Sequence, residues 1–189
     1  IQQEYLPKHY PDLRVLGVIR PIAEKMASLQ NIKRIGIIGT RATINSNSYI
    51  KEIKALNPKV ELFQKATPLL VPLIEESYAK KPETKMILKK YLLELKLKKV
   101  QALVLACTHY PFLLKEIRKI MGKKCLVFDP GKIVSDSLGD YIKRHPEMDL
   151  KDKTKKECVF YTTDNIEMFK RLGEFFLKKK INNIKKIEL

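Results

Sequence analysis

Near its middle the chain reads Val100-Gln101-Ala102-Leu103-Val104-Leu105-Ala106-Cys107-Thr108-His109-Tyr110-Pro111. The part that precedes the cysteine is apolar except for Gln101, which is typical of a strand buried on both faces of a parallel sheet. Polar and reactive side chains follow at once, and Pro111 favours the start of a helix. The stretch therefore predicts a strand that ends where a helix begins, with a thiol, a hydroxyl and an imidazole at the junction.

The same alternation of strand and helix extends over the rest of the chain. Apolar runs typical of strands recur at residues 14–19, 34–39, 59–63, 125–128 and 157–161. Amphipathic stretches typical of helices recur at residues 21–29, 45–55, 69–79, 84–97, 111–121, 134–142 and 166–176. Residues 146–156 predict a polar loop, and the basic tail 178–189 is expected to fray. The pattern predicts an α/β fold, with parallel sheets flanked by helices and ligands bound beyond the carboxyl ends of the strands.

Composition narrows the class of protein. A chain of 189 residues with 44% hydrophobic content can form one or two small domains. It contains no apolar run long enough to cross a membrane, and its first eight residues carry no signal-peptide pattern. Because it lacks an initiator Met, we expect the gene to begin further upstream. Three cysteines without close spacing argue against a disulfide framework and favour the cytoplasm.

The formal net charge of +17 raises the question of nucleic-acid binding. The lysines are spread along the chain, mostly beside apolar helical faces, and no basic stripe interleaved with aromatic residues appears. Excess lysine alone gives only weak, salt-sensitive attraction. We therefore do not expect specific nucleic-acid binding. The chain also lacks the glycine-rich patterns typical of dinucleotide and nucleoside-triphosphate sites.

Cys107 is the first candidate for chemistry. A thiol at a helix N-terminus has a lowered pKa, because free backbone N–H groups favour the thiolate. The alternative is a small buried side chain, which suits Cys125 and Cys158 better because both lie inside or beside apolar runs. His109 is close enough to assist proton transfer. Cys107 and His109 supply at most two metal ligands, so we expect no metal site.

Polar residues after the strand at 34–39 form a second candidate group. Thr40 and Thr43 begin this group, and residues of these types also cap helices. We favour a ligand-binding role for Thr40 and leave both interpretations open for Thr43. Glu75 follows an apolar run, and its carboxylate either belongs to a solvated helix face or enters a pocket to tune a histidine. The residues alone leave that choice open.

The chain resembles the glutamate racemases of the aspartate/glutamate racemase superfamily. The resemblance covers nearly the whole chain and rests on three segments: Gly39-Thr40-Arg41-Ala42-Thr43-Ile44, Val71-Pro72-Leu73-Ile74-Glu75 and Ala106-Cys107-Thr108-His109-Tyr110-Pro111. The closing stretch from Phe160 to Phe169 is similar to the final strand and helix of that family. The resemblance implies two similar α/β domains with the active site between them.

The resemblance also implies a function. Such an enzyme interconverts L- and D-glutamate without a cofactor and supplies D-glutamate for peptidoglycan, using two cysteines on opposite faces of the substrate Cα. By this resemblance Cys107 is one of the pair, His109 assists its proton transfer, and Glu75 is a supporting acid. Thr108 contacts the substrate carboxylate, and Thr40 and Thr43 line the pocket. Glutamate is then the expected partner, and a homodimer is left open.

The chain departs from the family in its N-terminal part. The family's Asp-Ser-Gly and Pro-Tyr-Gly segments and its Cys-Asn-Thr motif are missing, and neither Cys125 nor Cys158 lies in a matching sequence. We therefore expect residues 21–130 to form the racemase domain that carries Cys107, with residues 1–20 and 131–189 as the remnant of an incomplete first domain. We also expect this polypeptide alone not to racemise glutamate. The alternatives are an enzyme like the aspartate or hydantoin racemases and a non-catalytic basic binding protein.

Overall fold

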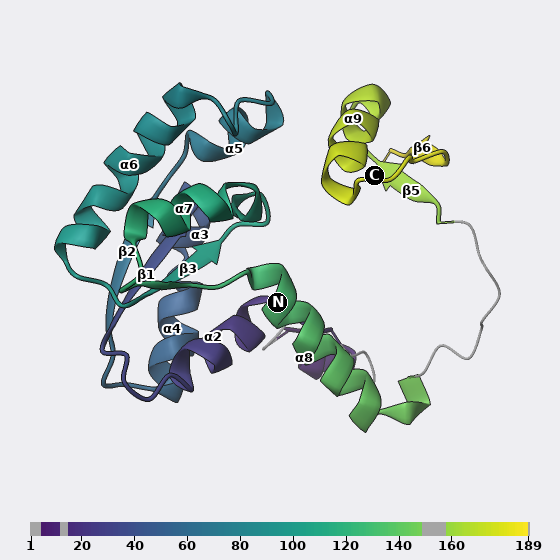
Figure 1. Cartoon of the computed structure of the whole chain (residues 1–189). Coiled ribbons are helices and arrows are strands. Elements are labelled where there is room, and N and C mark those ends of the chain that lie inside the picture. Colours follow the sequence, from purple (N-terminus) through teal and green to yellow (C-terminus); the bar gives the residue numbers. More distant parts are fainter. Residues whose placement is uncertain (1–4, 12–14, 149–157, 189) are drawn as a thin grey trace. The chain divides into compact units, whose positions relative to one another are not determined.

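A four-stranded parallel sheet forms the centre of the larger part of the chain (Figure 1). The computed structural model describes residues 5–11, 15–148 and 158–188. The chain forms two compact units, residues 1–145 and residues 146–189. The four strands of the first unit lie in the order β2-β1-β3-β4. Each of these four strands is followed by a helix, which confirms the predicted α/β class.

The helices and strands of the first unit alternate along the chain. They are α1 (Tyr5–His9), α2 (Ile19–Ala27), β1 (Arg34–Gly39), α3 (Arg41–Asn45), α4 (Ser48–Leu56), β2 (Glu61–Ala66), α5 (Leu70–Glu75), α6 (Pro82–Leu97), β3 (Ala102–Ala106), the 3-10 helix η1 (Tyr110–Leu113), α7 (Leu114–Met121), β4 (Leu126–Val127) and α8 (Pro130–Arg144).

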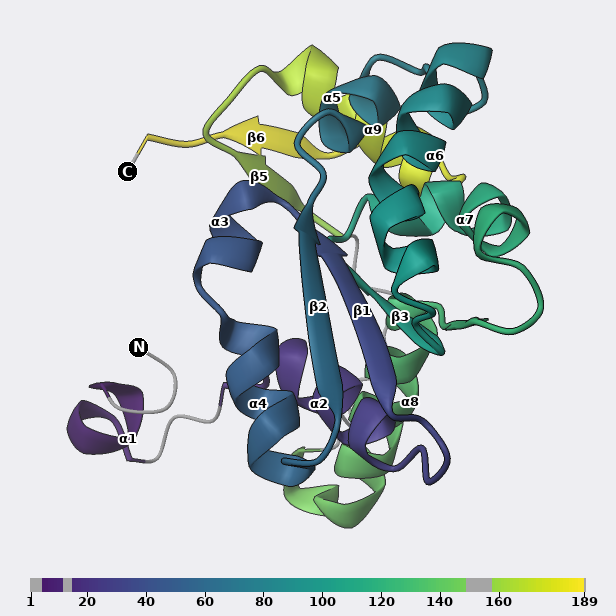
Figure 2. The same cartoon turned by 90° about the vertical axis from the view of Figure 1, so that its left-hand side faces the viewer.

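The central strands β1 and β3 are buried, as an apolar run in a parallel sheet requires. One face of the sheet packs against α2, α4 and α8, through a core that includes Ile22, Ile37, Ile53 and Val104. Helices α6 and α7 lie on the other side of the sheet (Figure 2). There Gly36 leaves room for Leu103 and other apolar side chains, because a Cβ at position 36 would lie only 3.0 Å from Leu103 Cδ1.

The second unit contains the 3-10 helix η2 (Pro146–Met148), β5 (Phe160–Thr162), α9 (Ile166–Leu177) and β6 (Ile184–Lys186). Strands β5 and β6 pair in parallel, with Phe160 opposite Ile184. The expectation that the tail 178–189 frays was therefore wrong, because residues 184–186 form a strand. Most of the predicted loop 146–156 lies outside the described residues.

The predicted strand at residues 14–19 was also wrong. Position 14 lies outside the described residues, residues 15–18 form no strand, and α2 already begins at Ile19. Val15, Leu16 and Val18 are 45–53% exposed, and no strand among the described residues pairs with this apolar run. The predicted division into residues 21–130 and a partner assembled from residues 1–20 and 131–189 stays a prediction. Within the described part of the chain, no helix is long and apolar enough to cross a membrane.

Candidate functional site

Three strands of the sheet end at the same edge, and polar residues follow each of them. Gly39 at the end of β1 lies opposite Ala66 of β2 on one side and opposite Ala106 of β3 on the other. The next residues are Thr40, Thr67 and Cys107. Because neighbouring strands lie about 4.8 Å apart, this register brings the three side chains to one edge of the sheet. This edge is where α/β proteins bind their ligands.

Cys107, His109 and Glu75 form a continuous chain of contacts at this edge. The Cys107 Sγ lies 3.9 Å from His109 Nδ1. On the other side of the ring, His109 Nε2 lies 3.0 Å from Glu75 Oε1. Glu75 is the last residue of α5 and is 34 positions away in sequence, so only the fold brings it to the imidazole. The carboxylate of Glu75 thus contacts the histidine, which is the geometry that one of its two open interpretations requires.

The contact with Glu75 favours one tautomer of the neutral imidazole ring. An ionised carboxylate can only accept hydrogen bonds, so His109 Nε2–H donates to Glu75 Oε1. In the neutral ring Nδ1 is then an acceptor that faces the Cys107 thiol. Thr108 Oγ1 also lies 3.5 Å from this nitrogen. The arrangement suits a proton that passes between the thiol and the imidazole.

The electrostatics of Cys107 differ from the expectation. Burial raises the pKa of the Cys107 thiol above its ordinary value. The backbone N–H groups of His109 and Tyr110 oppose this shift, as a helix N-terminus should, and the negative charge of Glu75 adds to it. The prediction of a lowered pKa was therefore wrong, because loss of solvation outweighs the helix N-terminus at this position. Burial therefore favours the thiol over the thiolate at Cys107.

Thr40 and Thr43 lie together at the start of α3. Thr40 is the N-cap residue, and its hydroxyl accepts a hydrogen bond from the Thr43 backbone N–H at 3.3 Å. The two hydroxyl oxygens lie 3.0 Å apart. Capping therefore accounts for part of their presence. Neither side chain is fully buried, so both hydroxyls remain accessible to a ligand at the edge of the sheet.

Thr67 and Tyr110 form a buried pair that the sequence analysis did not identify. Their hydroxyl oxygens lie 2.6 Å apart, and the Thr67 hydroxyl also donates to the Gly39 carbonyl at 3.2 Å. Both residues are fully buried. The pair connects the ends of β1 and β2 to the turn that carries Cys107 and His109. A polar residue directly after β2 was the available signal, but the strand was predicted to end at residue 63 and it ends at Ala66.

The other two cysteines differ in their exposure to solvent. Cys125 is buried, in agreement with a packing role, whereas Cys158 is exposed, so its expected burial was wrong. Among residues 5–11, 15–148 and 158–188, no group of three or more His, Cys, Asp or Glu side chains is placed to hold a metal ion.

Comparison with known proteins identifies relatives of this chain. Residues 8–137 match the family model described as Asp/Glu/Hydantoin racemase. The protein named glutamate racemase 2 of Caldanaerobacter subterraneus is 35% identical over 173 residues, which are 92% of this chain and 65% of that protein. A glutamate racemase of a Thermoanaerobacter species is 33% identical over 94% of this chain and 67% of its own length. The chain thus spans about two thirds of the length of these relatives.

Solved structures show the same likeness. The glutamate racemase of Francisella tularensis, crystallised in complex with D-glutamate, superposes with a TM-score of 0.80 at 31% identity, over 90% of this chain and 62% of that one. The isoform RacE1 from Bacillus anthracis superposes with a TM-score of 0.85 at 27% identity, over 94% of this chain and 66% of that one.

Proposed function

The chain belongs to the Asp/Glu/hydantoin racemase family, and we propose that it takes part in the cofactor-independent interconversion of L- and D-glutamate, which supplies D-glutamate for peptidoglycan. The observation that carries the proposal is the contact chain from Cys107 through His109 to Glu75 at the carboxyl edge of the sheet. The names of the relatives support glutamate as the substrate.

In this proposal Cys107 moves the proton on one face of the substrate Cα. His109 Nδ1 accepts the thiol proton, which leaves a thiolate in a partly buried site. The thiolate then removes the proton from Cα, and the electron pair of the C–H bond is stabilised as an enolate by donors around the carboxylate. Glu75 stabilises the imidazolium that forms while His109 holds the proton, in the way a buried carboxylate supports a catalytic histidine.

The hydroxyl groups at the same edge bind the substrate. We assign Thr108 to the α-carboxylate and Thr40 and Thr43 to the lining of the pocket, where short hydroxyl side chains donate to carboxylate oxygens. Racemisation also needs a proton donor on the opposite face of Cα. Within the 189 residues neither Cys125, which is buried, nor Cys158, which belongs to the other unit, lies in a matching sequence. This polypeptide therefore contributes one face of the site, and alone it exchanges a proton without inverting the substrate.

Exchange of the substrate Cα proton in D2O tests this proposal. We expect the chain to replace the Cα–H of one glutamate enantiomer with deuterium, followed by proton NMR, with no change in optical rotation. Glutamate should also slow the alkylation of Cys107 by iodoacetamide. The matched control is Cys107→Ala, in which exchange should vanish while the circular dichroism spectrum is unchanged.

Three results would contradict the proposal. If neither glutamate enantiomer exchanged its Cα proton or protected Cys107, glutamate would be removed as the substrate. Equal exchange of aspartate and glutamate would favour the alternative of an enzyme like the aspartate racemases. Formation of D-glutamate by the 189-residue chain, above the Cys107→Ala control, would show instead that a second proton donor lies within these residues.

A further inference from the structure

A cavity lies at the edge of the sheet opposite the Cys107 site, where the strands begin. Its volume is about 770 Å³, within the range of small-molecule sites. Arg34 and Glu61, the first residues of β1 and β2, line it together with Gln101, which directly precedes β3. Cys107 follows the other end of β3. A ligand in this cavity would therefore leave the thiol site open.

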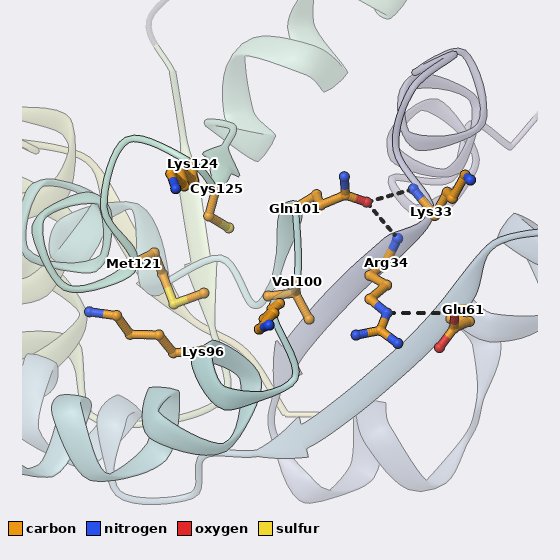
Figure 3. A pocket seen from close by; sticks show the side chains of 10 residues that line it. Lys33, Arg34, Glu61, Lys96, Val100, Gln101, Met121, Lys124 and Cys125 are labelled. Atoms are coloured by element: carbon orange, nitrogen blue, oxygen red, sulfur yellow. Dashed lines mark hydrogen bonds and ion pairs between the residues drawn. The ribbon is translucent and has the colours of Figure 1, made fainter.

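The cavity is strongly cationic, and its cations come from different elements of the fold. Figure 3 shows several of these side chains around the opening. The lining contains the cations Lys33, Arg34, Lys96, Lys99 and Lys124. Among the described residues that line the cavity, Glu61 is the single carboxylate, and it already lies 3.5 Å from Arg34 Nε. The lining thus carries a formal charge of +5 − 1 = +4.

Two of the cations have structural partners. Arg34 Nη1 donates to the Lys98 carbonyl at 3.2 Å, beyond the end of α6. Lys96 Nζ donates to the Ile120 carbonyl at 2.9 Å, in the last turn of α7. Cations that bind the free carbonyls of helix C-termini stabilise the helices. These two side chains are therefore accounted for by the fold.

The other three cations have no such role. Within the described ranges, the Lys33, Lys99 and Lys124 ammonium groups have no hydrogen-bond or ion-pair partner, although all three line the same concave surface. Like charges so placed repel one another, and a bound anion removes that repulsion. The cavity wall also includes the apolar side chains of Val100 and Met121, which are only 5% and 6% exposed.

We propose that this cavity binds a small organic diphosphate. The phosphoryl oxygens accept hydrogen bonds from the three free ammonium groups, and the organic part lies against the apolar wall. Nucleic acid fits less well, because the described lining contains no aromatic side chain on which a base could stack. The inference is independent of the racemase proposal, since it uses none of the residues around Cys107.

Isothermal titration calorimetry of the whole chain with ADP tests the proposal, with inorganic pyrophosphate as a second probe. The test variant is the triple substitution Lys33→Gln, Lys99→Gln and Lys124→Gln. A matched control removes three exposed lysines that do not line the cavity, at residues 51, 80 and 90, so that the net charge is the same. All six side chains are exposed, and circular dichroism verifies that both variants stay folded.

We expect one ADP to bind per chain, with a dissociation constant raised roughly tenfold or more in the test variant and less than threefold in the control. Glu61→Gln should tighten binding severalfold, because it removes the single carboxylate of the described lining. Cys107→Ala should bind ADP unchanged, even if glutamate exchange fails.

Four outcomes would overturn the proposal. Absence of saturable binding would remove the site. Equal weakening in both triple variants would show that only the net charge of the chain attracts ADP. Pyrophosphate binding as tightly as ADP would remove the role of the apolar wall. A single-stranded oligonucleotide that binds more tightly than ADP, with the same loss in the test variant, would make the cavity part of a nucleic-acid surface.

Discussion

The buried pair of Thr67 and Tyr110 supplies the sharpest test of how the candidate site is held together. The substitutions Tyr110→Phe and Thr67→Val each remove one hydroxyl from a contact of 2.6 Å while keeping nearly the same volume. The pair links three strand ends, so its loss affects the turn that carries Cys107. The two single variants and the double variant together form a thermodynamic cycle.

The structure predicts unequal costs for the two changes. In Tyr110→Phe the Thr67 hydroxyl keeps the Gly39 carbonyl at 3.2 Å as an acceptor, so the loss is one neutral hydrogen bond, about 1 kcal/mol. In Thr67→Val the buried Tyr110 hydroxyl keeps only the residue 67 carbonyl at 3.4 Å, a poor contact. A buried hydroxyl left nearly unpaired costs about 2–3 kcal/mol.

The double variant should be destabilised by less than the sum of the single variants. Two apolar groups then meet where two hydroxyls met, and no polar group is left unpaired, so we expect a total of about 2 kcal/mol rather than 3–4. Urea unfolding followed by far-UV circular dichroism measures all three costs. Additive costs, or a larger cost for Tyr110→Phe than for Thr67→Val, would refute this account of the pair.

Three further predictions concern titration and packing. Because burial raises the pKa of Cys107, its alkylation by iodoacetamide should reach half-maximal rate at a higher pH than the alkylation of free cysteine does. Glu75→Gln removes a negative charge and should lower this midpoint pH. An unchanged midpoint in that variant would contradict the role of Glu75. Burial raises the pKa of Tyr49 to about 12, so the folded state binds more protons than the unfolded state between pH 10 and pH 12. Stability should therefore fall through this range by up to about 1.4 kcal/mol per pH unit, and Tyr49→Phe should flatten the fall in urea titrations. Gly36→Ala should cost about 1–3 kcal/mol because its Cβ would lie 3.0–3.3 Å from three core side chains. Gly139→Ala in α8, with open space among the described residues, should stabilise the chain by about 0.5–1 kcal/mol, measured by the same urea unfolding.

Strands buried on both faces were the most predictable part of the fold. The runs that became β1 and β3 are apolar nearly throughout, and they were predicted to within two residues. Such a run has one stable environment, the interior of a parallel sheet. The run at residues 15–19 is as apolar, but strand formation depends on a neighbouring strand that sequence does not reveal. Instead of a strand, helix α2 begins at Ile19. Pro21 lies in its first turn, where the backbone N–H that proline lacks is not needed for a helical hydrogen bond.

The short strand β6 was not predicted, because its sequence lacks the apolar pattern that is typical of a strand. Ile184 is preceded by Asn183 and followed by Lys185 and Lys186, and the segment has no alternating apolar pattern. Its pairing with β5 satisfies backbone groups and exposes the two lysines, as the burial of this strand shows. A strand held mainly by backbone hydrogen bonds does not need an apolar side-chain pattern, so the sequence does not indicate it.

The sequence indicated which residues follow the strand ends at the candidate site, but it did not indicate their contacts. The Cys107 motif and Thr40 follow directly from the end of a recognisable strand. The approach of Glu75 to His109 spans 34 positions, and the contact of Thr67 with Tyr110 spans 43. Both depend on how α5 and β2 lie against the sheet. No local pattern encodes that placement.

The raised pKa of Cys107 favours proton transfer over nucleophilic attack as its chemistry. Cysteines that attack carbon act as thiolates and lie where their pKa is lowered. Here the site keeps the proton on sulfur and places the acceptor nitrogen of His109 3.9 Å away. A thiolate formed there is a stronger base than an ordinary one, and removing a proton from carbon needs base strength. Incubation with glutamate should therefore leave the mass of the chain unchanged in mass spectrometry, and a covalent adduct on Cys107 would contradict this argument.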